Sequence, residues 1–135
     1  MPSAEKIKEI FSHIEEGFGP SFFDHCADNV RWTVTGVDNP LRGTYPSKAE
    51  LVKPYQRVGA LMEPPGIRSE IRHLLIANTG DMAVVEFTAK AKLKSGGNYT
   101  LESTWVCRFD GDKIVEARVY MDSAHMKKIL EQGEK

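Results

Sequence analysis

Cysteine is scarce in this chain, and neither sign of charge is in excess. The two cysteines among 135 residues, Cys26 and Cys107, lie far apart, and each falls within an apolar pattern. Such a pattern is typical of reduced, buried thiols rather than of a disulfide framework. The 18 basic and 19 acidic side chains leave a formal net charge of -1, which provides no basic field for nucleic acid. We therefore expect a cytoplasmic protein that does not bind nucleic acid.

Long apolar runs, repeats and clustered metal ligands are also missing from the sequence. No stretch reaches the length of a membrane span, and the first residues, MPSAEKIKEIF, lack the apolar segment of a signal peptide. No spacing of His, Cys, Asp or Glu is typical of a metal site, and Gly96-Gly97 is expected to form a hairpin rather than a phosphate-binding loop. The sequence thus predicts no membrane partner, metal or cofactor, and a single domain over residues 1–135.

Apolar residues at helical spacing predict three helical segments in the first half of the chain. Residues 3–16 have the pattern of an amphipathic helix, and residues 21–29 are expected to form a short second helix. Ser47 and Glu50 have the spacing of a capping box, in which each side chain satisfies a free backbone N–H at the start of a helix. This predicts a long third helix that continues to the Pro64-Pro65-Gly66 segment.

Alternation of apolar and polar residues predicts five strands. The first covers residues 30–35, a loop follows over residues 36–46, and four further strands form an antiparallel meander after Ile67. The odd-numbered residues are expected to face inward: Ile71, His73, Leu75, Ala83, Val85, Phe87, Ala89, Leu101, Ser103, Trp105, Cys107, Phe109, Val115, Ala117, Val119 and Met121. Helices on one face of such a curled sheet make an α+β domain whose wide end forms a pocket.

The register of the meander depends on the length of its loops. Three-residue loops at 78–80, 94–96 and 110–112 keep the odd-numbered residues on one face. If the last loop has two residues instead, Glu102 and Thr104 turn inward. The sequence leaves both registers open.

The order of these elements resembles that of the nuclear-transport-factor-2-like superfamily, especially its SnoaL-like and ketosteroid-isomerase-related branch. The segments ADNVRW, NPLRGTYPSKAEL, TGDMAVVEF and FDGDKIVEARVYMD carry this resemblance, which extends over nearly the whole chain. It implies a cone-shaped barrel, in which a curved, mainly antiparallel sheet wraps around a deep apolar pocket, with N-terminal helices and a long third helix. It also implies a homodimer formed through the outer face of the sheet.

The family's proton-handling acids are missing at the matching positions. The position of the general-base Asp of ketosteroid isomerases corresponds to Val34. The acid that SnoaL-like cyclases and epoxide hydrolases carry three places before the terminal Asp, here Asp122, corresponds to Val119. The Arg and Asp that epoxide hydrolases carry on the third strand correspond to Phe87 and Ala89. These apolar residues argue against the mechanisms known for those relatives.

His73 and Tyr55 are the candidate catalytic residues. His73 shares the predicted inward face with Ile71 and Leu75, and a neutral imidazole can act as acid, base or hydrogen-bond donor near neutral pH. Tyr55 on the third helix offers a phenol donor at the mouth of the pocket. The alternative for His73 is a core imidazole bonded to a backbone carbonyl.

Aromatic and apolar residues on the inward face are the candidate ligand-binding residues. They are Trp32, Val34, Tyr45, Phe87, Ser103, Trp105, Val119 and Met121. Ordinary core packing is the alternative for the two tryptophans, and a local hydrogen bond is the alternative for Ser103. Asp122 is expected to cap the last helix.

Two classes of function fit these observations. In the first, the pocket binds a small apolar molecule, polyketide- or terpenoid-like, and catalyses its isomerisation, cyclisation or dehydration without a cofactor, as an isomerase or lyase. In the second, the same fold is a non-catalytic module for ligand binding or protein interaction, which the missing acids favour. The polarity of the pocket separates the two, because catalysis needs convergent polar groups and carriage does not.

Overall fold

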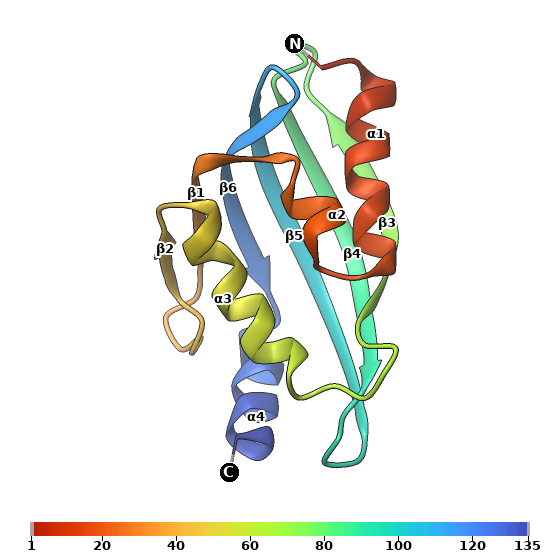
Figure 1. Ribbon diagram of the computed structural model, residues 1–135, viewed down its shortest axis with the longest axis vertical. Helices are drawn as coiled ribbons and strands as arrows, with labels where there is room; N and C mark the ends of the chain where they lie inside the picture. The colour runs from red at the N-terminus through yellow and green to blue at the C-terminus, as the bar shows by residue number, and fades with distance from the viewer. Residues whose placement is uncertain (1, 135) are drawn as a thin grey trace.

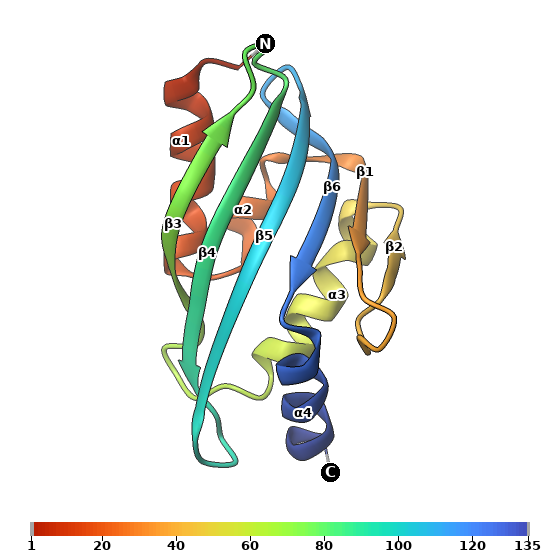
Figure 2. The same ribbon diagram turned by 180° about the vertical axis from the view of Figure 1, so that it is seen from behind.

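The computed structural model describes residues 2–134, which fold into one curved sheet with helices against one of its faces (Figure 1). The elements are α1 (Ala4–Ser12), the 3-10 helix η1 (His13–Glu16), α2 (Pro20–Phe23), β1 (Cys26–Val34), β2 (Gly43–Tyr45), α3 (Lys48–Gly59), β3 (Arg68–Ile76), β4 (Met82–Lys92), β5 (Asn98–Asp110), β6 (Lys113–Met121) and α4 (Ser123–Gly133). From the opposite side, β3 to β6 lie in front, and none of the described helices crosses them (Figure 2). The predicted α+β class is confirmed.

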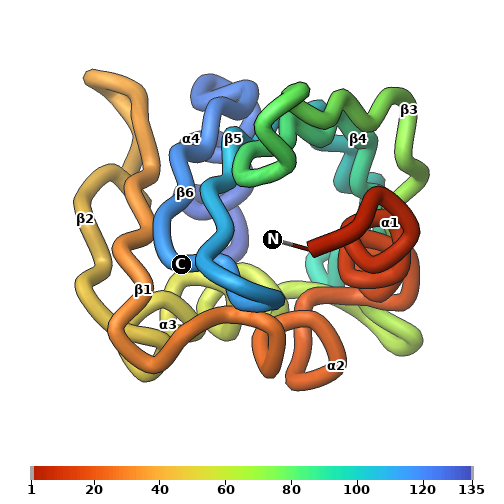
Figure 3. The backbone as a smooth tube through the Cα atoms, turned by 90° about the horizontal axis from the view of Figure 1, so that it is seen from above, coloured from red at the N-terminus to blue at the C-terminus, as the bar shows by residue number. Residues whose placement is uncertain are grey.

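The sheet is open rather than closed. Its strand order is β2-β1-β6-β5-β4-β3, so β2 and β3 form its two edges, and β1 runs parallel to β6 while the other neighbours are antiparallel. The predicted curved, mainly antiparallel sheet is therefore confirmed, but its closure into a barrel is wrong. Viewed along the long axis, α1, α2 and α3 lie on the concave side of the curved sheet (Figure 3).

Three segments differ from the prediction. The third helix ends at Gly59 rather than at the Pro64-Pro65-Gly66 segment, and Met62 instead forms a bridge with Leu93. The stretch predicted as a loop over residues 36–46 contains β2, whose three residues are too few to show alternation. The second helix ends at Phe23 rather than at residue 29, because Cys26 already belongs to β1 and lies opposite Ile114 of β6. The sheet consequently has six strands rather than five.

Side-chain caps start α3 and α4. The Ser47 hydroxyl accepts a hydrogen bond from the Glu50 N–H at 3.2 Å and begins α3 as predicted, but the Glu50 carboxylate accepts from Lys53 Nζ at 3.0 Å instead of completing the predicted capping box. Asp122 Oδ1 accepts from the His125 N–H at 3.1 Å and begins α4. The longest of these helices, α3, has 12 residues, and no described helix is long and apolar enough to cross a membrane.

A bulge preserves the register between β5 and β6. Only Gly111 and Asp112 separate the strands, so the hairpin has the two-residue loop of the second alternative. An extra residue, Val115, then shifts the pairing by one and places odd-numbered residues opposite one another again. Glu102 and Thr104 therefore do not turn inward, and Ile114 replaces Val115 in the core.

A second bulge, in β3, turns His73 outward. Ile71 lies opposite Phe87, but His73 lies opposite Glu86, because Arg72 is an extra residue in the strand. Such a shift exchanges the two faces of a strand. The His73 side chain is 70% exposed and Leu75 is 60% exposed. The prediction that these two residues face inward is wrong.

The core lies between the sheet and the helices, and aromatic side chains form its centre. Trp32 and Trp105 pack edge to face with their ring centroids 5.0 Å apart, and the ring of Phe22 lies 5.4 Å from that of Trp105. Both cysteines are free and buried, as predicted. Burial raises the pKa of the Cys26 thiol to about 12, so this thiol stays protonated and unreactive.

Candidate functional site

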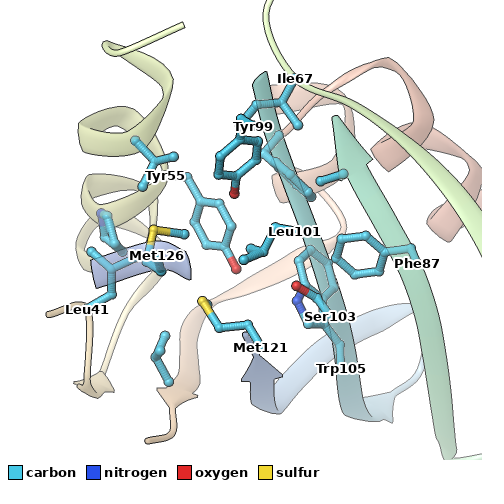
Figure 4. Close-up of a pocket in the computed structure, with 15 residues that line it drawn as sticks. Leu41, Tyr55, Ile67, Phe87, Tyr99, Leu101, Ser103, Trp105, Met121 and Met126 are labelled. Carbon is cyan, nitrogen blue, oxygen red and sulfur yellow. The ribbon is translucent and has the colours of Figure 1, made fainter. Parts of the chain in front are cut away.

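A small apolar pocket lies between α3 and the inner face of the sheet (Figure 4). Its walls are formed by Phe18, Val34, Leu41, Pro54, Tyr55, Val58, Ile67, Phe87, Ala89, Tyr99, Leu101, Ser103, Trp105, Met121 and Met126. The free space inside is about 30 Å³. That is room for one or two water molecules, so the side chains fill most of the pocket in this conformation.

Two regular elements supply the polar atoms of the pocket. On β5, Tyr99 and Ser103 share the inner face because every second side chain of a strand points to the same side and these two residues are four apart. On α3, Tyr55 and Val58 lie three residues apart and share one face of the helix. The rings of Tyr55 and Tyr99 reach into the pocket from opposite walls (Figure 4).

Tyr55 is the most unusual of these groups. Its hydroxyl is buried and has no hydrogen-bond partner among the described residues, and the same is true of the indole N–H of Trp32 beside it. Burial raises the pKa of Tyr55 well above its ordinary value, and the Trp32 indole N–H, which lies near the hydroxyl oxygen but outside ordinary hydrogen-bond geometry, acts in the opposite direction. Burial also raises the pKa of Tyr99. Both phenols are therefore neutral hydrogen-bond donors at physiological pH and cannot act as bases.

The pocket brings together some of the predicted site residues. Tyr55 and five of the predicted ligand-binding residues line it, namely Val34, Phe87, Ser103, Trp105 and Met121. Trp32 and Val119 do not line it, because both are fully buried in the core behind it. Tyr45 also lies outside the lining, where its hydroxyl donates to the Leu41 carbonyl at 2.6 Å.

His73 lies on the outer face of the sheet. Its Nδ1 is 3.0 Å from Glu86 Oε1, and it borders an open groove together with Arg72 and Tyr120. The sheet separates this groove from the interior pocket, so His73 cannot reach a molecule bound there. Its prediction as a proton-handling residue of the pocket is wrong.

Phe18 is a pocket residue that periodicity did not reveal. It lies between η1 and α2, in a segment without an apolar repeat, and its ring packs 5.2 Å from that of Tyr55 and 5.6 Å from that of Trp105. An outer depression of about 280 Å³ shares Phe18, Tyr55 and Ile67 with the pocket. These three side chains therefore separate the pocket from the surface.

Comparison with known proteins supports the predicted fold. The family model described as SnoaL-like domain matches residues 7–117. Dimerizing cyclase phiC from Fungal sp. (strain ATCC 74256) is 25% identical over 130 residues, which make up 95% of this chain and 57% of that protein. The chain thus spans little more than half the length of this curated relative.

Solved structures show the same architecture. An NTF2-like protein of unknown function from Burkholderia pseudomallei superposes with a TM-score of 0.74 at 21% identity, over 93% of this chain and 95% of that one. TerC, co-crystallized with polyporic acid, superposes with a TM-score of 0.73 at 18% identity, over 94% of this chain and 96% of that one. These likenesses agree with the nuclear-transport-factor-2-like fold expected from the sequence.

Proposed function

Because the chain belongs to the SnoaL-like domain family, we propose that its pocket binds a small, largely apolar molecule and directs the cyclisation of that molecule, or a related isomerisation or dehydration. The apolar lining fits a polyketide- or terpenoid-like compound. The similarity to a cyclase from a fungus supports the reaction class. In this proposal Tyr55 donates a hydrogen bond to an oxygen of the substrate.

The unpartnered hydroxyl of Tyr55 carries the proposal. A buried polar group without a hydrogen bond costs about 1–3 kcal/mol of stability. A ligand oxygen that accepts this hydrogen bond recovers that cost, whereas a pure hydrocarbon does not. The geometry therefore favours an apolar ligand with one acceptor oxygen, such as a ketone.

The pocket can contribute to catalysis in two ways: its apolar wall fixes the conformation of the substrate, and the Tyr55 hydroxyl donates a hydrogen bond. As a carbon–carbon bond forms at a carbonyl group, negative charge develops on its oxygen, and a donor already in position stabilises that charge. Among the described residues, the lining contains no carboxylate or imidazole. The nucleophilic carbon therefore comes from an enol form of the substrate itself, and the proton of the enol hydroxyl passes to the new alkoxide oxygen as the carbon–carbon bond forms. Loss of one such donor lowers kcat by about 100-fold in comparable sites, and we expect this effect from Tyr55→Phe.

Ligand entry requires side chains to move. Ligand pockets usually measure at least about 300 Å³, which the interior space and the outer depression reach only together. Phe18 stands between them and follows Gly17, whose φ of 126° favours glycine. The two methionines of the lining, Met121 and Met126, are flexible enough to repack around a ligand. We therefore place the entrance at Phe18.

Native mass spectrometry of protein purified from its own host tests the proposal. We expect one small organic molecule per chain, retained by the wild type and depleted in Tyr55→Phe. Catalysis predicts that the wild type converts this molecule to an isomer, or to a product lighter by one water, and that Tyr55→Phe does so more slowly. If the molecule is bound but never altered, the protein is a carrier, which the absence of an acid or imidazole from the lining would explain. Retention by both proteins alike would rule out the role of Tyr55.

We also propose that two copies pair through the outer face of the sheet. No described helix covers this face, and Leu75 and Tyr120 expose 60% and 45% of their surface on it. Light scattering during gel filtration should report twice the 15.1 kDa mass of the chain. Tyr120→Glu should halve that mass, whereas a monomeric wild type would contradict this pairing.

A further inference from the structure

Three potential metal ligands meet at the surface beside α1, and none of them lines the pocket. They are Glu9, His13 and His25, whose ligand atoms all lie within 4.8 Å of one another. His13 Nε2 is 3.5 Å from Glu9 Oε1, and the two imidazole rings stack with centroids 5.3 Å apart and planes inclined by 21°. We propose that this cluster binds a divalent transition-metal ion of the zinc class.

The backbone holds the three residues in place. Glu9 and His13 are four residues apart, so their side chains lie on one face at the end of α1. His25 comes from the turn between α2 and β1. Its N–H donates to the Phe22 carbonyl at 2.9 Å, and its carbonyl accepts from the Ile114 N–H at 2.9 Å. The third ligand is therefore presented by a segment that both α2 and the sheet fix.

The donor set suits zinc. Two imidazole nitrogens and one carboxylate oxygen are ligands that Zn²⁺ prefers, and three protein ligands leave a fourth position for water. Ligand atoms around a tetrahedral ion lie about 3.4 Å apart, given metal–ligand distances of about 2.1 Å. Glu9 is exposed and both histidines are half-buried, so small side-chain rotations can close the remaining gap.

Two lysines lie near the cluster, Lys6 and Lys113, and neither occupies the position that a metal ion would take. Lys6 contacts the other carboxylate oxygen of Glu9, Oε2, at 3.5 Å, whereas Oε1 faces His13. Lys113 donates a hydrogen bond to the Asp24 carbonyl at 2.6 Å, and this contact fixes its ammonium group at the backbone.

Calorimetric titration of the full chain, without an affinity tag, with zinc chloride tests this site. We expect one Zn²⁺ per chain, and a loss of affinity on the order of 10- to 100-fold in His13→Ala and in His25→Ala. Glu9→Gln should also weaken binding, and because it keeps the shape of an exposed side chain it serves as the variant least prone to misfold. His73→Ala is the matched control, since His73 contacts Glu86 much as His13 contacts Glu9, and it should bind as the wild type does.

The ring signals of the histidines in NMR spectra identify the ligands independently of the variants. Addition of Zn²⁺ should shift the signals of His13 and His25 and leave those of His73 and His125 in place. Absence of saturable binding to the wild type would overturn the proposal. The proposal would also be overturned if Glu9→Gln and His25→Ala both bound Zn²⁺ as tightly as the wild type does, or if only the signals of His73 shifted.

Discussion

Replacing Tyr55 with Phe should stabilise the free protein. The change removes a hydroxyl that is buried without a partner among the described residues and leaves the aromatic packing of the ring unchanged. The cost of such a group is about 1–3 kcal/mol, so the free energy of unfolding should rise by about 1–2 kcal/mol and Tm by roughly 5 °C. A residue kept for function at the expense of stability behaves in this way.

Urea unfolding monitored by tryptophan fluorescence measures this effect. The rings of Trp32 and Trp105 lie 6.1 and 6.2 Å from that of Tyr55, so they report the packing around it. Tyr45→Phe is the matched control: it removes a hydroxyl that donates to the Leu41 carbonyl at 2.6 Å and should lower the free energy of unfolding by about 1 kcal/mol. Unchanged or reduced stability in Tyr55→Phe would show that the hydroxyl has a hydrogen-bond partner in the free protein.

Three other changes test the entrance, a helix cap and the buried thiols. Phe18→Ala removes the ring that separates the pocket from the outer depression, and should speed association of an apolar dye about tenfold in stopped-flow fluorescence; an unchanged rate would place the entrance elsewhere. Asp122→Ala removes the cap of α4 and should cost about 1 kcal/mol in thermal unfolding, whereas Asp122→Asn should not. The free energy of unfolding should fall as pH rises from 9.0 to about 12, because burial raises the pKa of Cys26 and the unfolded thiol loses its proton first. Cys26→Ala should reduce that slope in alkaline urea titrations and leave the share of Cys107, whose pKa burial also raises, whereas an unaltered slope would contradict the role of Cys26.

The alternation of apolar and polar residues predicted strand register correctly where the apolar residues of a strand can occupy only one face of the sheet. On β4 and β5 the apolar residues alternate without ambiguity, and the pairs Phe87–Ser103 and Val85–Trp105 form as expected. The two bulges fall at or just before adjacent apolar residues, so that either face can be the inner one. In β6 the extra residue, Val115, follows Ile114, and in β3 the extra residue, Arg72, precedes the run Leu74-Leu75-Ile76. An extra residue at such a place leaves the apolar content of both faces nearly unchanged, and the error for His73 follows from that.

The pocket and the cluster of Glu9, His13 and His25 were predictable only in part. Tyr99 and Ser103 follow from the alternation of β5, but Phe18 and Leu41 come from irregular segments whose position depends on tertiary packing. The spacing of Glu9 and His13 on one helix face is visible in the sequence. His25 joins them only because α2 stops early and the turn before β1 brings its ring against that of His13.

Ligand binding by this pocket depends on whether Tyr55 donates a hydrogen bond to the oxygen of an apolar ligand. Two probes of similar shape, 2-acetylnaphthalene and naphthalene, differ in one carbonyl group, and their binding can be measured by quenching of the fluorescence of Trp32 and Trp105. One hydrogen bond of about 1–1.5 kcal/mol corresponds to roughly a tenfold difference in Kd. If Tyr55 donates to the ligand oxygen, Tyr55→Phe lowers the preference for the ketone by about that factor. An equal preference in the two proteins would show that Tyr55 does not bind the ligand oxygen.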